Sequence, residues 1–169
     1  EAGTQLAAIN RALGDWLAED ARVLLLGEDL RSPYGGAFKA TRGLSDEHPR
    51  RVLNTPISEA GIVGIANGLA LGGRRPVVEI MFGDFLALCF DQLLNHAAKF
   101  RGMYNGRVSS AIVVRAPMGG GRGYGPTHSQ NLEKHLVGVP GLRVIVLHGR
   151  APIASLYQAL RGSVEPTLI

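Results

Sequence analysis

Apolar residues follow two alternating patterns along the chain, one with the period of a helix and one made of short continuous runs. The helical pattern is clearest in residues 4–19, where one stripe holds Leu6, Ile9, Leu13, Trp16 and Leu17. Thr4 precedes this stripe as a candidate N-cap. Further helices are predicted at 58–71, 85–100, 131–138 and 152–161. Apolar runs predict buried strands at 22–29, 51–55, 75–81, 110–117 and 142–147, and the sequence ends in a strand-like PTLI.

The alternation of strands and helices predicts an α/β fold, with a doubly wound, mainly parallel sheet and helices on both faces. The chain length of 169 residues fits a single domain with a sizeable core, and we expect residues 1–169 to form it. In such sheets, ligands bind at the carboxyl ends of the strands. The residues that follow the strands are therefore the first candidates for a functional site.

Acidic, apolar and histidine side chains follow the first four predicted strands. In chain order they are Glu28 and Asp29, then Ile57, Ser58 and Glu59, then Met81, Phe82, Asp84 and Phe85, and finally a glycine-rich loop with His128. A mostly apolar pocket with a few directed polar groups is typical of a cofactor site. Plainer interpretations remain, because a helix dipole favours a glutamate at a helix head and buried Met or Phe side chains are ordinary core.

Composition and motifs disfavour several classes of protein. The net charge of +4 comes from scattered basic residues, and aromatic residues make up only 6% of the chain, so we expect no nucleic-acid surface. The patterns G-x-G-x-x-G, G-x-x-x-x-G-K-[ST] and G-x-S-x-G are absent, and the histidines form no metal-ligand pattern with Cys89. This single cysteine is expected in the core. With no signal peptide and no apolar run of membrane-spanning length, we expect a cytoplasmic protein that contacts no membrane.

A stripe of small residues marks the helix predicted at 58–71. Ala60, Gly64, Gly68 and Gly72 recur every four residues and so share one helix face. Each glycine inside a helix costs about 0.5–1 kcal/mol relative to alanine, which suggests that another backbone comes close to this face. Two interpretations stay open, namely packing against the chain's own sheet and contact with another subunit.

Four blocks of the sequence resemble a known family. They are GEDLRSPYGGAFKATRGL, VLNTPISEAGIVGIANGLALGGRRPVVEIMFGDF, FDQLLNHAAKFRGMYNG and RAPMGGGRGYGPTHSQNLEKHLVGVPGLRVI. Together they are similar to the pyrimidine-binding domain of thiamine diphosphate-dependent enzymes in the transketolase-like superfamily. The similarity covers nearly the whole chain and is strongest to the beta subunit of the decarboxylating component of 2-oxo acid dehydrogenase complexes. It implies an enzyme that decarboxylates a 2-oxo acid and transfers the resulting acyl or aldehyde unit.

The resemblance also implies roles for individual residues. Glu59, in TPISE, would share a proton with the aminopyrimidine ring of thiamine diphosphate and so promote deprotonation of the thiazolium carbon. Ile57, Met81 and Phe85 match positions that line the ring. His128, in THSQ, would face the reacting carbon and assist a step on the substrate. Glu28 matches an acid that would couple the two active sites of a tetramer, and it counts among the expected cofactor-binding residues.

Partners and metals follow from the same resemblance. No segment here is similar to the one that holds magnesium and the diphosphate, so both are expected on a diphosphate-binding, alpha-like partner chain within a heterotetramer. The carbonyls of Ile112, Leu160 and Ser163 match positions where some relatives hold a structural potassium ion. These residues include no counterpart of the C-terminal domain that is usual in beta subunits and that contacts an acyl-carrying partner. We therefore expect either a fragment of such a subunit or a naturally short pyrimidine-binding chain of a split enzyme.

Two other functions remain alternatives to a catalytic subunit. One is a regulatory or scaffolding subunit of the same fold without catalytic activity, although the presence of Glu59, Phe85 and His128 together argues against it. The other is an unrelated α/β nucleotide-binding module, which the lack of a phosphate motif disfavours. The glycine-rich segment MGGGRGYGP and the segment HGRAP both depart from the family's usual pattern, which leaves the 2-oxo acid and the acyl acceptor open.

Overall fold

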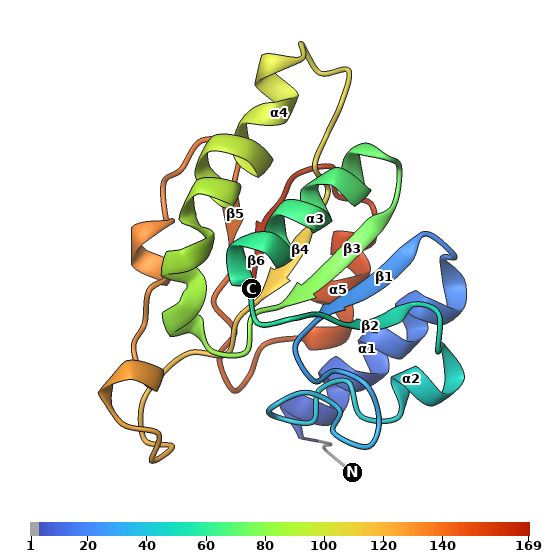
Figure 1. The fold of residues 1–169 in the computed structure, drawn as a ribbon, viewed down its shortest axis with the longest axis vertical. Coiled ribbons are helices and arrows are strands. Elements are labelled where there is room, and N and C mark those ends of the chain that lie inside the picture. Colours follow the sequence, from blue (N-terminus) through green and yellow to red (C-terminus); the bar gives the residue numbers. More distant parts are fainter. Residues whose placement is uncertain (1–3) are drawn as a thin grey trace.

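Parallel strands form one sheet in the order β2-β1-β3-β4-β6-β5 (Figure 1). The structure is a computed structural model that describes residues 4–169. The strands are β1 (Val23–Gly27), β2 (Val52–Asn54), β3 (Arg75–Glu79), β4 (Val113–Arg115), β5 (Arg143–Val144) and β6 (Thr167–Leu168). In the centre of the sheet, Leu25 of β1 pairs with Val52 on one side and Val77 on the other. The predicted doubly wound α/β fold is thus confirmed.

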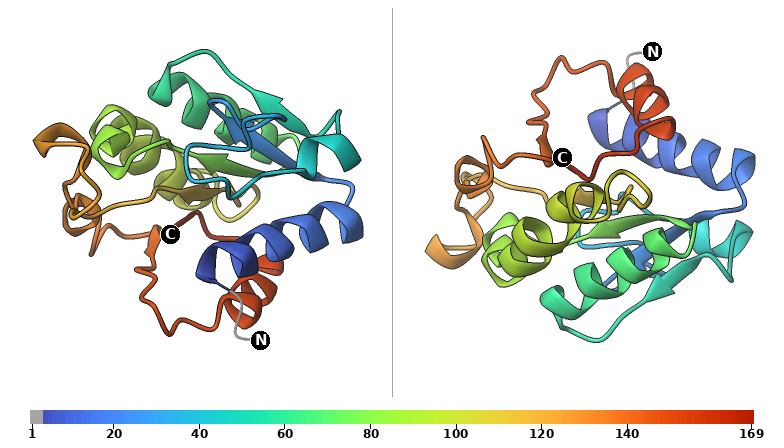
Figure 2. Two further views of the ribbon diagram at one scale, coloured as in Figure 1. Left: turned by 90° about the horizontal axis from the view of Figure 1, so that it is seen from below. Right: turned by 90° about the horizontal axis from the view of Figure 1, so that it is seen from above.

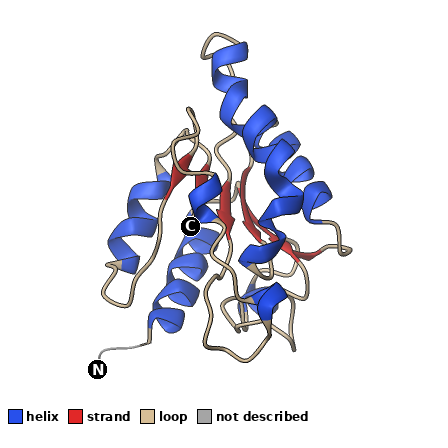
Figure 3. Ribbon diagram, turned by 90° about the vertical axis from the view of Figure 1, so that its left-hand side faces the viewer, coloured by secondary structure: helices blue, strands red, loops and turns tan. Residues whose placement is uncertain are grey.

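Helices cover both faces of the sheet (Figures 2 and 3). One face carries α1 (Gln5–Glu19) and α5 (Ile153–Arg161). The other face carries α3 (Glu59–Leu71) and the segments η1 (Gly83–Cys89), η2 (Gln92–Ala97) and α4 (Ala98–Met103). The remaining helical pieces are the short α2 (Leu44–Glu47), η3 (Pro126–His128) and η4 (Glu133–His135). Each face of the sheet therefore has its own apolar core.

Helix α1 forms as its apolar stripe predicts. The Thr4 hydroxyl accepts a hydrogen bond from the backbone N–H of Ala7 at 3.2 Å, which satisfies one free donor of the first turn. Leu13 and Leu17 are buried in the core, whereas Leu6 in the first turn is exposed. Trp16 is also buried, and its indole N–H donates to a carbonyl of α5, so the two helices on this face are tied together.

The helix predicted at 85–100 is irregular and longer than predicted. It begins at Gly83 as a 3-10 helix, widens to a π-helix at Gln92–Ala97 and ends as α4 at Met103. The carbonyl of Gln92 accepts a hydrogen bond from the side-chain amide of Asn67 at 3.0 Å. Because a side chain of α3 takes up this carbonyl at the start of the π-helix, the regular backbone ladder is interrupted at that point.

Other predicted boundaries are corrected as well. The helix predicted at 131–138 is reduced to the 3-10 turn Glu133–His135, because Gly138 has a positive φ and Pro140 follows closely. The predicted strands are shortened, most of all 142–147, of which only Arg143 and Val144 pair in the sheet. Ser58 does precede α3, but its side chain makes no capping hydrogen bond.

Candidate active site

Glu59 is the first residue of α3 and lies just beyond the carboxyl end of β2. The residue is only 6% exposed. Among residues 4–169, no hydrogen bond or ion pair to its carboxylate is found. A buried carboxylate is costly unless a partner satisfies it, although the N-terminus of α3 favours its charge. Glu59 is therefore placed to meet a polar group that this part of the chain does not supply.

Glu28 follows β1 and faces the same region. Its Oε1 atom is buried and has no hydrogen-bond partner in the described part of the chain. Burial raises the pKa of Glu28, and the neighbouring charges of Glu59 and Asp29 raise it further. Two acidic side chains from adjacent strands thus converge on one spot. This is the kind of environment in which carboxyl groups hold or exchange protons.

Three apolar side chains, Ile57, Met81 and Phe85, follow the ends of β2 and β3, and we call them the apolar rim. Met81 and Phe85 are half-buried, whereas Ile57 is 82% exposed on the loop before α3. Cys89, in the same segment η1 as Phe85, is buried as expected, and its pKa is raised to about 12 by burial first and by the charge of Glu59 second. The last effect places the head of α3 close to η1. Of the three rim residues, Ile57 is the one left open to solvent.

His128 lies beside this rim, on the loop that follows β4. Phe82 and Phe85 make edge contacts with its imidazole, with ring centroids at 4.8 and 5.3 Å and interplanar angles of 85° and 84°. The Nδ1 atom lies 2.9 Å from the hydroxyl of Thr127. The Nε2 atom is therefore the nitrogen left for chemistry. The structure brings Phe85 and His128 into contact, as a shared site requires.

Asp84 is a site residue whose role the sequence did not reveal. It is buried in η1, and its Oδ1 atom accepts hydrogen bonds from the backbone N–H of Gln130 at 3.1 Å and from the Gln130 side chain at 2.8 Å. Although burial acts to raise the pKa of Asp84, the bonds from Gln130 and Ser129 outweigh it and lower that pKa. Asp84 thus fixes the loop that carries His128. The two blocks FGDF and THSQ contain both partners, but nothing in their spacing signals the contact.

A buried ion pair lies at the carboxyl ends of β3 and β4, on the face of the sheet that α1 and α5 cover. Glu79 and Arg115 end β3 and β4, are paired in the register of the sheet, and form an ion pair at 2.6 Å. The Nε–H of Arg115 also donates to the hydroxyl of Tyr157 at 2.9 Å. Gly36 has a φ of +79°, and a Cβ there would lie 2.7 Å from Oε1 of Glu79. The loop after β1 therefore contacts the ion pair directly. The sequence signal that could have revealed the pair is the single charged residue in each of two apolar strands.

The small-residue stripe of α3 does not pack against its own sheet. A Cβ added at Gly68 would meet no atom within 4 Å, and Gly68, Gly72 and Ala60 are all exposed. Only Gly64 has a close neighbour outside the helix, because a Cβ there would lie 3.2 Å from Oε1 of Gln92. Ile65 on the same helix is 58% exposed. The interpretation that the stripe serves internal packing is therefore wrong for most of its length.

One cavity of the structure lies apart from the predicted site residues. This cavity of about 440 Å³ lies at the carboxyl ends of β4, β5 and β6, where Arg115, Met118 and Glu133 line it, but Glu59, Phe85 and His128 do not. Within residues 4–169, no group of three His, Cys, Asp or Glu side chains is arranged to hold a metal ion. None of the helices in this part of the chain is long and apolar enough to cross a membrane.

The carbonyls matched to a potassium site lie at the opposite end of the sheet. Those of Leu160 and Ser163 accept hydrogen bonds from Arg75 at 3.3 and 2.9 Å, and that of Ile112 accepts from the backbone N–H of Thr167 at 2.9 Å. All three carbonyls thus have partners within the chain. As arranged here, they do not fit a potassium ion.

Comparison with known proteins agrees with this arrangement. The acetoin:2,6-dichlorophenolindophenol oxidoreductase subunit beta of Cupriavidus necator is 41% identical over 147 residues, or 82% of this chain and 44% of its own length. The mitochondrial 2-oxoisovalerate dehydrogenase subunit beta of Chaetomium thermophilum is 43% identical, over 96% of this chain and 35% of its own length. The mitochondrial pyruvate dehydrogenase E1 component subunit beta-2 of Oryza sativa subsp. japonica is 41% identical, over 95% of this chain and 43% of its own length.

The chain thus spans less than half the length of these relatives. A solved structure described as "Split gene transketolase, inactive beta4 tetramer" has the same fold, with a TM-score of 0.72 over 96% of this chain and 49% of that one, at 22% identity. The family described as "Transketolase, pyrimidine binding domain" matches residues 4–168. The chain therefore belongs to the transketolase pyrimidine-binding domain family.

Proposed function

We propose that this chain is the pyrimidine-binding part of a thiamine diphosphate-dependent enzyme that decarboxylates a 2-oxo acid and transfers the resulting acyl or aldehyde unit. The observation that carries the proposal is Glu59 at the head of α3, which is only 6% exposed and whose carboxylate forms no hydrogen bond or ion pair with the described residues. The relatives described as beta subunits of acetoin, 2-oxoisovalerate and pyruvate enzymes support the reaction class.

Each site residue has a task in this proposal. Thiamine diphosphate, when bound, supplies the carbanion chemistry. Glu59 holds a proton at the ring nitrogen of the pyrimidine, through a charge-assisted hydrogen bond worth about 1.5–3 kcal/mol. Ile57, Met81 and Phe85 exclude water from the ring, which strengthens that bond. Glu28, beside Glu59, is the group through which a proton passes between the two active sites of an assembled tetramer.

His128 serves the substrate rather than the cofactor ring. Its Nδ1 is engaged with Thr127, and its ring makes edge contacts with Phe82 and Phe85, which support the imidazole on one side. The Nε2 atom then hydrogen-bonds to the substrate or transfers a proton during acyl transfer. Such positioned proton transfer typically contributes a factor of about 100 to 10,000.

The proposal requires a second chain. We propose an alpha-like subunit that holds the diphosphate and magnesium, and an assembly of two such pairs in which the small-residue face of α3 is a subunit contact. An acyl-carrying partner belongs to the same proposal. A cytoplasmic location also stays a prediction, and two of the relatives are described as mitochondrial.

The test compares Glu59→Gln with His128→Ala in the enzyme assembled with its diphosphate-binding partner, thiamine diphosphate and magnesium. Glu59→Gln keeps the shape but not the shared proton, so hydrogen–deuterium exchange at the thiazolium carbon should slow by orders of magnitude. His128→Ala should leave that exchange nearly unchanged and slow turnover of the 2-oxo acid. Unchanged exchange in Glu59→Gln would refute the assignment of Glu59, and equal loss of exchange in both variants would refute the division of roles.

A further inference from the structure

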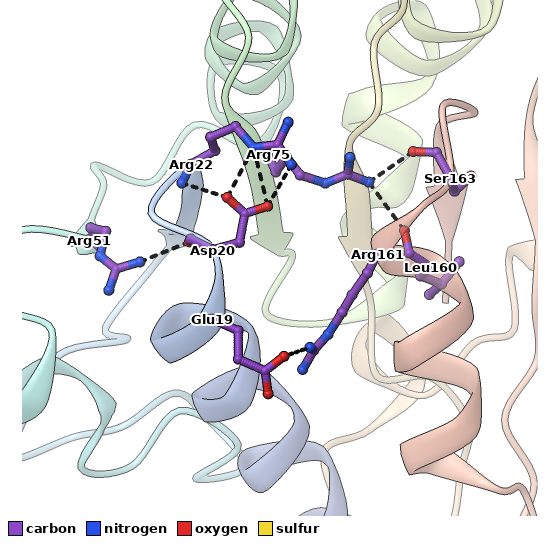
Figure 4. A network of polar contacts seen from close by, with 8 residues as sticks. All are labelled: Glu19, Asp20, Arg22, Arg51, Arg75, Leu160, Arg161 and Ser163. Carbon is purple, nitrogen blue, oxygen red and sulfur yellow. Dashed lines mark hydrogen bonds and ion pairs between the residues drawn. The ribbon is translucent and has the colours of Figure 1, made fainter.

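Arg75 reaches from the start of β3 to the end of α5, far from the candidate active site. Its Nη2 atom donates hydrogen bonds to the carbonyls of Ser163 at 2.9 Å and Leu160 at 3.3 Å. Figure 4 shows this guanidinium pointing into the turn that follows the helix. One nitrogen thus lies within hydrogen-bond distance of two backbone oxygens that belong to different residues of one turn.

These oxygens form a natural position for a cation. Helix α5 ends at Arg161, and the carbonyls of its last turn have no partners further along the helix. The Leu160 carbonyl accepts a hydrogen bond from the backbone N–H of Ser163 at 3.0 Å, and the carbonyls of Leu160 and Ser163 both accept from Arg75. The negative end of the helix dipole adds to the attraction for positive charge. A positive group is therefore favoured at the point where Nη2 lies.

A potassium ion bound by the same carbonyls would have to occupy the same point. It would also lie beside the charge of Arg75, and the guanidinium remains charged throughout the accessible pH range. Arg22 lies close by and adds a second positive charge, although Asp20, which Arg22 contacts at 2.8 Å, offsets part of it. Ser163 carries no carboxylate to balance an additional ion, and its hydroxyl is engaged with Glu165 and Arg143.

We propose that the guanidinium of Arg75 takes the place of a structural potassium ion, so that the fold of this chain is independent of potassium. The tethered side chain joins the start of β3 to the end of α5 as a bound ion would, without depending on the ion concentration. The neighbouring ion pairs of Arg22 with Asp20 and of Arg161 with Glu19 hold the surrounding segments in place (Figure 4). The inference does not rest on the proposed activity.

Thermal unfolding in matched salts tests the proposal on the protein as isolated. For the natural sequence, the Tm in potassium chloride should equal the Tm in choline chloride at the same ionic strength. Crystals soaked in thallium(I), a heavy substitute for potassium, should show no anomalous peak beside the carbonyls of Leu160 and Ser163. A saturable rise of Tm with potassium, or a thallium peak at these carbonyls, would overturn the proposal.

Two variants give an independent test. Arg75→Ala removes the bound cation, and the matched control Arg74→Ala removes the exposed arginine next to it. In choline chloride, Arg75→Ala should have a Tm roughly 3–10 °C lower than Arg74→Ala, since it loses charged hydrogen bonds to buried carbonyls. Equal Tm values for the two variants would contradict the proposal. If Arg75→Ala does not fold, Arg75→Lys, which keeps the charge, should fold, and failure of Arg75→Lys to fold while Arg74→Ala folds would contradict the cation role.

Discussion

The carboxylate of Asp84 holds Gln130 by two hydrogen bonds, one to its backbone N–H at 3.1 Å and one to its side-chain amide at 2.8 Å. Gln130 lies two residues beyond His128, so the bonds connect the loop of the histidine to the rigid segment η1. Phe85, the neighbour of Asp84 in the chain, also contacts the imidazole. One short segment thus determines both the position of the histidine loop and the wall against which the ring lies.

Asp84→Ala should therefore misplace His128 without affecting Glu59. We expect kcat for the 2-oxo acid to fall about 10–100-fold, which is typical of a displaced catalytic group, with little change in cofactor affinity. Asp84→Asn keeps an acceptor for Gln130 and should restore most of the activity. Steady-state kinetics with calorimetric binding of thiamine diphosphate would measure both effects. A kcat that matches the natural enzyme in Asp84→Ala would contradict the positioning role.

Glu28→Gln should stabilise the chain in the absence of cofactor. Since the folded-state pKa of Glu28 is raised above its usual 4.5, the folded protein binds the proton more tightly than the unfolded chain. The contribution of protonated Glu28 to the free energy of unfolding is fully present below about pH 4.5, and it decreases as the pH rises through the folded-state pKa. Glu28→Gln removes this decrease, so its Tm should exceed that of the natural chain at pH 7–8 and converge with it below pH 4.5.

The exposed Glu47→Gln provides the control for this pH series. It removes one acidic charge from the surface and should show no comparable gain at neutral pH. Thermal unfolding between pH 4 and pH 8 measures the three proteins side by side. A lower Tm for Glu28→Gln than for Glu47→Gln at pH 7 would show that Glu28 stabilises the folded chain in its charged form.

Arg115→Met should be strongly destabilising because it leaves Glu79 buried without its partner. Removing one member of a buried ion pair typically costs about 3–5 kcal/mol in the free energy of unfolding. The double variant Glu79→Gln/Arg115→Met, which removes both charges, should recover part of that loss. Urea denaturation of Arg115→Met, of Glu79→Gln and of the double variant measures the difference. If the double variant lost as much stability as the sum of the two single variants, the two charges would be acting independently.

Gly68→Leu should disrupt assembly while it leaves the monomer folded. The open space at Gly68 accepts a larger side chain, and leucine favours a helix over glycine by about 0.8–1 kcal/mol. At a subunit contact, the same side chain would hold two backbones apart. Analytical ultracentrifugation with thermal unfolding tests both effects. Gly64→Leu, which would press on Gln92, should instead destabilise the monomer, and intact assembly of Gly68→Leu would argue against a contact on this face.

The fold was predictable where the pattern of apolar residues is regular. Fully apolar runs such as VLLLG predict buried parallel strands, and the stripe through Leu13 and Leu17 predicts α1 with its Thr4 cap. The interruption at Gln92 was not predictable, because it depends on a hydrogen bond from Asn67, which lies 25 residues earlier in the chain. Strand ends were also uncertain, since apolar residues such as Ile145 continue past the last pairing residue to cover a core.

The residues of the candidate site were predictable from the sequence, whereas the hydrogen bonds between distant residues were not. Carboxyl ends of parallel strands meet at one edge, so Glu28, Glu59 and Phe85 were expected to converge, and their roles followed from the resemblance. The contacts of Asp84 with Gln130 and of Arg75 with Ser163 join residues 46 and 88 positions apart. No local pattern encodes such a distance. These side chains look like ordinary surface charges until the fold places them.

The place of β6 in the sheet limits how the sheet can form during synthesis at the ribosome. The strand lies between β4 and β5, although it is synthesised after both. Strand β5 therefore emerges before its neighbour exists, and it stays unpaired until Thr167 and Leu168 arrive to bond with Arg143, Val144 and the residues of β4. The nascent chain must keep this stretch from misfolding until then. The order of synthesis thus allows β1 to β4 to pair as they emerge, whereas β5 can join the sheet only after β6 has been made.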